Sequence, residues 1–324
     1  MPGVPLVRVV RSGVEESVHF GSVAVADVRG RLVARAGDPG RVAFARSSMK
    51  PLQAAVSLWV ADTELPDAEV AVMCASHNGE PVHVDAVREI LRRAGLDPGA
   101  LRCPPDRPLH PEDAAGVPEP APLFHNCSGK HAGMLLACVR SGWDLVSYQE
   151  PDHPLQRRVL EAVTTAAGQD PVAVGVDGCG VPVHALPLSS MATLYARLVS
   201  PDVFGPLRPH AERAVGAMTS EPYLVAGRDR VCTAVMQVDR GLVVKVGAEG
   251  LICAALRDRG VGVAIKVDDG NARAQAPALI RALVLLEALP PRLPEALTKY
   301  AHPPVLGGGR PVGELLAEFE LQAA

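Results

Sequence analysis

A hydroxyl and an amine stand three residues apart near the start of an expected helix. Ser47 and Lys50 form an S-x-x-K pattern, and this spacing places the two groups one turn apart on one helical face. An uncharged lysine amine can take the serine proton and so create an alkoxide nucleophile. The helix start adds partial positive charge and free N–H groups near the reacting oxygen. The alternative interpretation is that Ser47 caps the helix and Lys50 is a solvated first-turn residue.

A second serine and a second lysine occur in related patterns further along the chain. Ser76 begins an S-x-N pattern on a predicted loop, and Lys245 begins a K-x-G pattern on a Val-rich predicted strand. Serine acyl-transferases of the penicillin-recognising group carry S-x-x-K, S-x-N and K-x-G in this order. Alternatively, Ser76 is a turn residue and Lys245 a surface strand residue. The apolar surroundings of Lys245 favour a buried or site-facing amine.

Two cysteines lie in glycine-containing motifs that differ from the others. Cys127 and Lys130 are three residues apart at a predicted helix start, and Cys179 lies in the turn Asp177-Gly178-Cys179-Gly180. Two thiols from separate loops could bind a soft cation such as zinc and leave a position open. Alternatively, each is a buried structural cysteine, which is the interpretation we give to three cysteines in apolar runs: Cys74, Cys138 and Cys253.

The composition excludes several classes of protein. With 32 Lys and Arg against 36 Asp and Glu, the net charge of −4 argues against binding nucleic acid or a membrane surface by bulk charge. Hydrophobic residues make up 48%, as in an ordinary globular chain. The first residues lack the apolar core of a signal peptide, and no apolar run reaches the roughly 18 residues of a spanning helix. The odd count of seven cysteines is typical of free thiols, so we expect a soluble cytoplasmic protein.

Hydrophobic periodicity predicts strands at both ends of the chain and helices between them. Strands are expected over 5–37 and, as a four-stranded meander, over 231–267; a strand–turn–strand unit is expected over 171–188. Helices are expected over 47–62, 81–96, 128–142, 153–168, most of 187–219, and 272–289, followed by a Pro-rich stretch and a last short helix. Residues 69–74 fit a short buried strand or helix, and 103–122 a loop. The pattern predicts an α+β fold, with one antiparallel sheet from the N- and C-terminal segments covered by helices.

Five separated motifs together resemble one family. FARSSMKPLQA, CASHNGE, HNCSGKHAGM, VDGCGVP and KVGAEG are similar in content and order to the L-asparaginase II family, the Rhizobium-type serine–lysine, zinc-binding asparaginases. The resemblance implies a glutaminase/β-lactamase-like fold in a single domain over 1–324, with a helical subdomain around 80–220. It also implies a homodimer that hydrolyses the side-chain amide of L-asparagine to L-aspartate and ammonia through a Ser–Lys acyl-enzyme.

The same resemblance implies a role for each residue of the motifs. Ser47 would be the nucleophile with Lys50 as its base, and Ser76 with Lys245 would form a second pair that relays protons. The implied zinc ligands are Cys127, Lys130 and Cys179; Arg46, His131 and Asp177 would line the substrate pocket, with Cys232 as a nearby thiol. A lysine that binds zinc must lose its proton, so metal binding and the pKa of Lys130 would be coupled.

Other functions stay open at this stage. One alternative is a glutaminase, or a serine amidase or peptidase of the penicillin-recognising type. An alternative of another class is a zinc-binding protein without catalytic activity.

Overall fold

The computed structural model describes residues 3–324, which form two compact units. The first, called the sheet unit, comprises residues 3–48, 185–200 and 241–324; the second, called the helical unit, comprises 49–184 and 201–240. The expected single domain with a helical subdomain around 80–220 stays a prediction.

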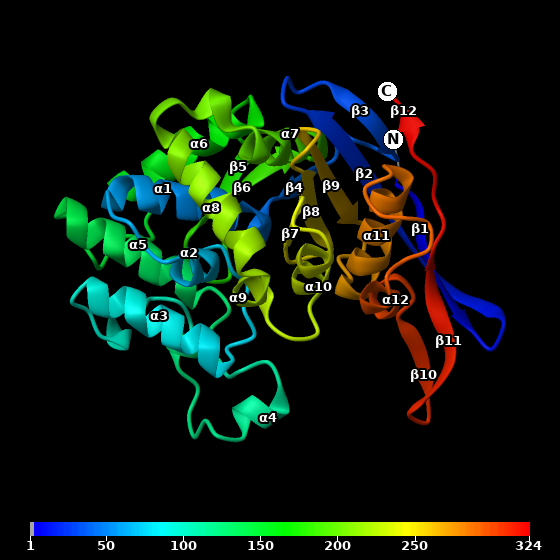
Figure 1. Cartoon of the computed structure of the whole chain (residues 1–324), viewed down its shortest axis with the longest axis horizontal. Helices are drawn as coiled ribbons and strands as arrows, with labels where there is room; N and C mark the ends of the chain where they lie inside the picture. The colour runs from blue at the N-terminus through cyan, green and yellow to red at the C-terminus, as the bar shows by residue number, and fades with distance from the viewer. Residues whose placement is uncertain (1–2) are drawn as a thin grey trace. The chain divides into compact units, whose positions relative to one another are not determined.

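The sheet unit contains the antiparallel sheet that the sequence predicts, and this confirms the α+β fold class. Its main path runs in the order β10-β11-β1-β2-β9-β8-β7, so strands from the two ends of the chain pair directly (Figure 1). A side branch pairs β2 with β3 and β3 with β12. The strands are β1 (Val4–Arg11), β2 (Val14–Asp27), β3 (Leu32–Ala36), β7 (Leu242–Val246), β8 (Leu251–Leu256), β9 (Val261–Val267), β10 (Pro304–Gly307), β11 (Arg310–Ala317) and β12 (Gln322–Ala323).

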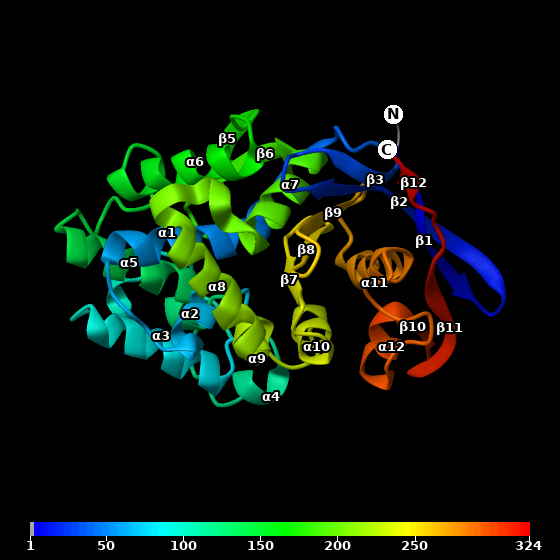
Figure 2. The same cartoon turned by 45° about the horizontal axis from the view of Figure 1, so that its top comes forward.

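Helices cover both faces of the middle of this sheet. Successive residues of a strand point to opposite faces, yet every residue of β8 is buried. The helices α7 (Leu188–Val199) and α11 (Gln275–Leu285) both contact β8 and β9, and Figure 2 shows them on either side of these strands. The unit also contains η5 (Ala272–Ala274), α12 (Glu295–Ala301) and the short strand β4 (Val42–Phe44), which pairs with residues 185–187 of β6 (Pro182–Pro187).

Two parts of the predicted pattern differ from the structure. The first strand of the expected 231–267 meander is wrong, because Val231–Val238 forms the helix α10. Its buried apolar residues Val231, Cys232, Val235 and Met236 follow a helical rather than an alternating period, and Thr233 is buried between them. The last short helix expected after the Pro-rich stretch is wrong, because the helix α12 lies within that stretch and the hairpin of β10 and β11 follows it. The short segment at 69–74 is part of the helix α2 (Asp67–Met73).

The helical unit is built around two almost fully buried helices. These are α1 (Lys50–Ala61) and α5 (Ser128–Ser141), which contact each other directly. Gly129 lets α5 approach α2 closely, since a Cβ there would lie 2.1 Å from the carbonyl oxygen of Val72. The surrounding elements are α3 (Pro81–Arg93), η2 (Pro98–Ala100), α4 (Pro111–Ala114), η3 (Pro122–Phe124), α6 (Pro154–Ala167), β5 (Ala173–Val176), η4 (Pro201–Leu207), α8 (Arg208–Ser220), α9 (Pro222–Ala226) and α10. The turn η1 (Arg46–Met49) leads into α1.

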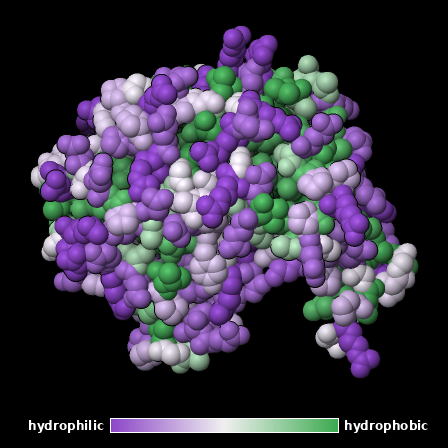
Figure 3. All heavy atoms as spheres, in the orientation of Figure 1, coloured by the Kyte–Doolittle hydropathy of each residue, from purple (hydrophilic) through white to green (hydrophobic). Residues whose placement is uncertain are grey.

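The surface is that of a charged globular protein. Hydrophilic residues cover most of the face in Figure 3, and hydrophobic residues are scattered among them. Within the described range, every helix is too short or too polar to cross a lipid bilayer.

Candidate active site

A buried lysine–serine pair lies at the start of α1 in the helical unit. Lys50 is the first residue of the helix, and its side chain is 0% exposed. Its Nζ donates to Ser76 Oγ at 2.9 Å and to the carbonyl oxygens of Ala75 at 2.6 Å and Asn126 at 3.2 Å. All three acceptors are uncharged oxygens. The buried lysine head group thus contacts the Ser76 hydroxyl directly, inside a cage completed by two backbone carbonyls.

His77, the residue after Ser76, is buried and held by hydrogen bonds through both ring nitrogens. His77 Nδ1 accepts the backbone N–H of Gly79 at 3.1 Å, so the ring proton lies on Nε2 and donates to Ser128 Oγ at 3.0 Å. The Ser128 hydroxyl in turn donates to the carbonyl oxygen of Leu123. Burial lowers the pKa of His77 well below its ordinary value, and the nearby His83 ring and Lys50 lower it further. The imidazole therefore stays uncharged beside the amine.

A cavity of about 310 Å³ opens beside this pair. Its walls come from the link after α2, from the 103–122 loop and from residues just before α5 and α10: His77, Asn78, Asp106, Arg107, Pro108, Leu109, Phe124, Asn126 and Arg230. Asn126 lines the cavity and also offers its carbonyl oxygen to Lys50. Asn126 thus connects the cavity wall to the Lys50–Ser76 pair, although neither Lys50 nor Ser76 lines the cavity itself.

The predicted metal residues form a second buried cluster in the same unit. Lys130 Nζ donates to Cys179 Sγ at 3.0 Å, and the nearby Cys127 thiol donates to Asn126 Oδ1 at 3.0 Å. The proximity of Cys127 and the charge of the Lys130 ammonium both lower the pKa of Cys179. Burial alone would lower the pKa of Lys130, but the two sulfurs raise it. The two groups thus shift each other's pKa in the directions that favour a charged thiolate and a charged ammonium.

Two predicted pocket residues contact this sulfur cluster. His131 Nδ1 lies 2.5 Å from the hydroxyl of Tyr148, and the imidazole ring lies near the Cys179 sulfur. Burial lowers the pKa of His131 to about 4. The Cys179 thiol lies 3.7 Å from a carboxylate oxygen of Asp177. The structure thus brings His131 and Asp177 to the same place as the three predicted zinc ligands.

The chemistry of this donor set fits a soft divalent cation. Two buried cysteine sulfurs lie beside one lysine nitrogen, and cysteine sulfur is a ligand that zinc prefers. Lys130 would have to release its proton to bind a metal. Over residues 3–324, no group of three or more His, Cys, Asp or Glu side chains is placed to hold a metal ion. The predicted set contains only two such residues, with lysine as the third.

Three other predicted residues, Arg46, Ser47 and Lys245, belong to the sheet unit. Arg46 and Ser47 are half-buried in the turn η1, where Arg46 has a φ of 47°. Lys245 is 0% exposed on β7, opposite Cys253 of β8, and its Nζ donates to the carbonyl oxygen of Val246. The predicted pairings of Ser47 with Lys50 and of Ser76 with Lys245 join residues of different units and stay predictions.

Sequence reasoning missed three residues around the Lys50–Ser76 pair. Asn126 contributes a backbone carbonyl, which no side-chain pattern reveals. Asn78 was visible as the third residue of the S-x-N pattern, but its partners were not. Arg230 lines the cavity and donates to Asn78 Oδ1 at 2.8 Å, and no spacing in the sequence indicated it. Cys232, the predicted nearby thiol, is buried on α10.

Comparison with protein families gives one match over nearly the whole chain. A family model described as L-asparaginase II matches residues 7–317. A local similarity of 39% identity over 71 residues links the chain to a vacuolar membrane protease of Verticillium alfalfae. It covers 22% of this chain and 6% of the protease, so the chain spans only a small part of that protein.

Several solved structures have a distantly similar backbone. Mglu in its native form has a TM-score of 0.46 at 16% identity, covering 83% of this chain and 65% of Mglu, just under two thirds. A Bacillus glutaminase has a TM-score of 0.46 at 12% identity, covering 82% of this chain and 91% of the glutaminase. A β-lactamase from Mycobacterium bovis has a TM-score of 0.44 at 16% identity, covering 83% and 95%.

Proposed function

Because the chain belongs to the L-asparaginase II family, and is therefore an amidohydrolase, we propose that it hydrolyses the side-chain amide of L-asparagine to L-aspartate and ammonia. The observation that carries this proposal is the buried Lys50 amine, which donates to the Ser76 hydroxyl among uncharged oxygens. Such an amine, when unprotonated, is a base for serine chemistry.

In the proposed reaction Ser47 is the nucleophile. Its Oγ forms a bond to the amide carbon while its proton passes to the Lys50 amine, as the S-x-x-K spacing indicates. Backbone N–H groups at the helix start hold the negative charge of the tetrahedral intermediate. The C–N bond then breaks, and the proton reaches the leaving nitrogen through Ser76, with Lys245 as the second amine of the relay. Water cleaves the resulting ester, which releases aspartate and restores the serine.

The remaining predicted residues would hold the substrate. Arg46, His131 and Asp177 are proposed to bind its charged α-amino and α-carboxylate groups, with Cys232 as a nearby thiol. Zinc would be held by Cys127, Lys130 and Cys179, and when bound it would supply a Lewis acid that attracts an oxygen or nitrogen of the substrate. We also propose a homodimer located in the cytoplasm, which sedimentation and cell fractionation would test.

The direct test replaces the proposed nucleophile. Purified Ser47→Ala protein should release ammonia from asparagine at no more than about a thousandth of the wild-type rate. Ser141→Ala, at a half-buried position near the end of α5, serves as the matched control and should retain activity. Near wild-type release by Ser47→Ala would refute the nucleophile assignment. Faster release from glutamine than from asparagine, or covalent labelling by a penicillin, would replace the proposed substrate with those of the alternatives.

A further inference from the structure

The link between α2 and α3 is bound to the segment between α9 and α10. The backbone N–H of Ser76 donates to the carbonyl oxygen of Val225 at 3.0 Å, and that of Asn78 to Ala226 at 2.9 Å. These two hydrogen bonds fix the position of the Ser76 backbone relative to residues 223–230. Anything that holds residues 223–230 in register therefore also holds the hydroxyl that Lys50 contacts.

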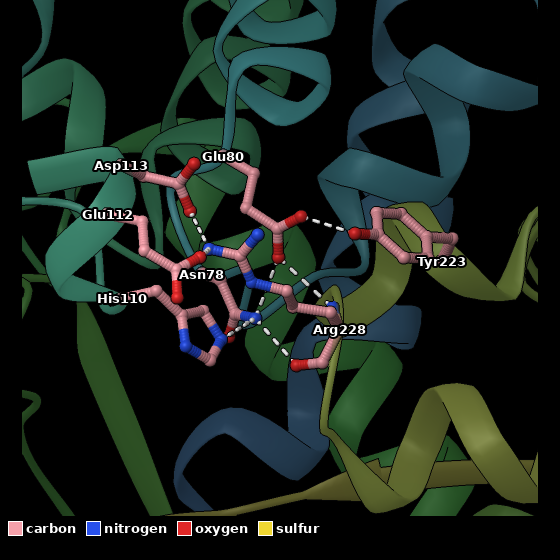
Figure 4. A network of polar contacts seen from close by, with 7 residues as sticks. All are labelled: Asn78, Glu80, His110, Glu112, Asp113, Tyr223 and Arg228. Carbon is pink, nitrogen blue, oxygen red and sulfur yellow. Dashed lines mark hydrogen bonds and ion pairs between the residues drawn. The ribbon is translucent and has the colours of Figure 1, made fainter. Parts of the chain in front are cut away.

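Asn78 uses its whole side-chain amide inside the protein. Its Nδ2 donates to Glu80 Oε1 at 2.8 Å and to the carbonyl oxygen of Arg228 at 2.9 Å, with His110 Nε2 at 3.2 Å (Figure 4). Its Oδ1 accepts from Arg230. With two amide hydrogens and one acceptor oxygen engaged in this way, Asn78 acts as a connector in the cavity wall.

Glu80 is at the centre of this network. It occupies the N-cap position of α3, but its side chain makes no capping hydrogen bond and points to residues 223–228 instead. One carboxylate oxygen accepts from Asn78 and from the backbone N–H of Arg228 at 3.0 Å, and the other accepts from the Tyr223 hydroxyl (Figure 4). The side chain is buried. Burial alone would raise its pKa, but these hydrogen bonds lower it, so the carboxylate stays charged.

The backbone of the 223–230 segment is shaped to admit this carboxylate. Gly227 has φ 109° and ψ −166°, a conformation that side-chain-bearing residues rarely adopt. A Cβ at this position would lie 2.3 Å from Glu80 Oε1 and 2.6 Å from Asn78 Nδ2. The Glu80 carboxylate therefore occupies space that is free only because residue 227 is a glycine.

The side chain of Arg228 extends the network to the 103–122 loop. Its guanidinium lies 2.6 Å from a carboxylate oxygen of Asp113 and 3.2 Å from one of Glu112 (Figure 4). The backbone N–H of Leu109, which lines the cavity, donates to the carbonyl oxygen of Asn78 at 2.7 Å. The backbone of Arg228 thus contacts Asn78 and Glu80, which are linked to Ser76. The side chain of Arg228 contacts the 103–122 loop, which forms another part of the cavity wall.

We propose that Glu80 is a positioning residue of the amidase: its carboxylate fixes Asn78 and residues 223–228, and so holds the Ser76 hydroxyl against Lys50. The inference rests on the proposed function, because it concerns the same serine and lysine. Two residues of this network, Glu80 and Arg228, have different roles. Glu80 sets the geometry of the reacting groups, and the Arg228 guanidinium sets the fit of the loop around the substrate.

The test compares kcat and KM for asparagine in variants of the full chain. Glu80→Gln keeps the shape but loses the charge, and should lower kcat on the order of 100-fold with little change in KM, as expected for a small misplacement of reacting groups. Arg228→Met keeps the backbone contacts to Glu80 and Asn78 but frees the loop. It should raise KM by about tenfold with kcat nearly unchanged. A general loss of folded protein would not produce these opposite patterns.

Two further variants keep the experiment decisive. Tyr223→Phe removes a single hydrogen bond to Glu80 and should lower kcat by about tenfold. This variant tests the inference even if Glu80→Gln does not fold. The matched control is Glu89→Gln, on the surface of α3 and paired with Arg92, which should leave both constants unchanged.

The outcomes separate the inference from the proposed function. If wild-type protein is active and Glu80→Gln or Tyr223→Phe behaves like Glu89→Gln, the inference is wrong and the proposed function stands. If wild-type protein releases no ammonia from asparagine or glutamine, the proposed function fails and the inference falls with it.

Discussion

Lys50 and Lys130 are two buried lysines of the helical unit with similar positions and different neighbours. Each lies in the first turn of a buried helix, where the helix dipole disfavours a positive charge. Lys50 donates to a serine hydroxyl and two backbone carbonyls, whereas Lys130 contacts the sulfur of Cys179. Around Lys130 the sulfurs raise the pKa of the amine and lower that of the Cys179 thiol.

The difference shows that the neighbours of a buried amine decide its chemistry. A thiolate partner stabilises the ammonium and, once the proton is lost, offers a soft donor set for a metal. The neighbours of Lys50 are instead a hydroxyl and two backbone carbonyls, which accept its hydrogen bonds. We propose proton transfer as the role of Lys50 and metal binding as the role of Lys130.

The largest effect is expected from Lys50→Met, which removes the amine and keeps most of the side-chain volume. Ammonia release from asparagine should fall by about 10⁴-fold, because the base for the nucleophile is gone. The exposed Lys299→Met is the matched control and should keep wild-type activity. Measurable turnover by Lys50→Met at a tenth of the wild-type rate or more, about 1.4 kcal/mol of barrier, would contradict the assignment.

Ser76→Ala also tests the role proposed for Lys50. It removes the one side-chain acceptor of Lys50 and the proposed proton relay, but not the proposed nucleophile. The rate of ammonia release should fall by about 10³-fold, less than for Lys50→Met. A larger loss than that caused by Ser47→Ala, with the fold intact by circular dichroism, would exchange the roles of the two serines.

Cys179→Ser tests the metal binding proposed for the cluster around Lys130. Removing the sulfur that contacts Lys130 should abolish zinc binding in a dialysed sample and lower kcat/KM by about 100-fold. Elemental analysis of the purified protein measures the metal directly. Cys138→Ala, which removes a thiol from the apolar core of α5, should retain its zinc. Equal metal content in the two variants would show that the sulfur cluster is not the metal site.

The smallest effect concerns pH and the neutral surroundings of Lys50. The pKa of His77 is lowered in the folded protein, so below about pH 6.5 the unfolded chain takes up a proton that the folded chain does not. Stability should therefore fall as the pH decreases, by about 1.4 kcal/mol per pH unit for this one group. His77→Gln should flatten this dependence in urea unfolding between pH 6.5 and 5. An unchanged slope would mean that His77 is charged in the folded protein.

The sequence predicted the sheet of the fold better than its connections. Val-rich runs at both chain ends predicted strands that do pair, since alternation and β-branched residues report a pleated, half-buried surface. The run at 231–238 misled the prediction, because a short, wholly apolar segment fits a strand or a buried helix equally well. The hairpin of β10 and β11 was missed because its strands contain prolines and glycines, which usually mark turns.

The candidate site was predictable where motifs carry reactive side chains and not where tertiary contacts do. The patterns around Cys127, Lys130 and Cys179 predicted residues that the fold brings within hydrogen-bond distance. The contact of Lys50 with Ser76 was not predicted, because local spacing cannot show that α1 and the link after α2 meet. Glu80 carries no motif at all, and its importance arises from partners about 150 residues away in sequence.

Mass spectrometry of enzyme quenched during asparagine turnover tests the central claim most directly. The account predicts an aspartyl ester on the peptide that contains Ser47, present in wild-type protein and absent from Lys50→Met. Turnover without any such adduct, or an adduct on a cysteine of the sulfur cluster, would contradict serine–lysine catalysis by this protein.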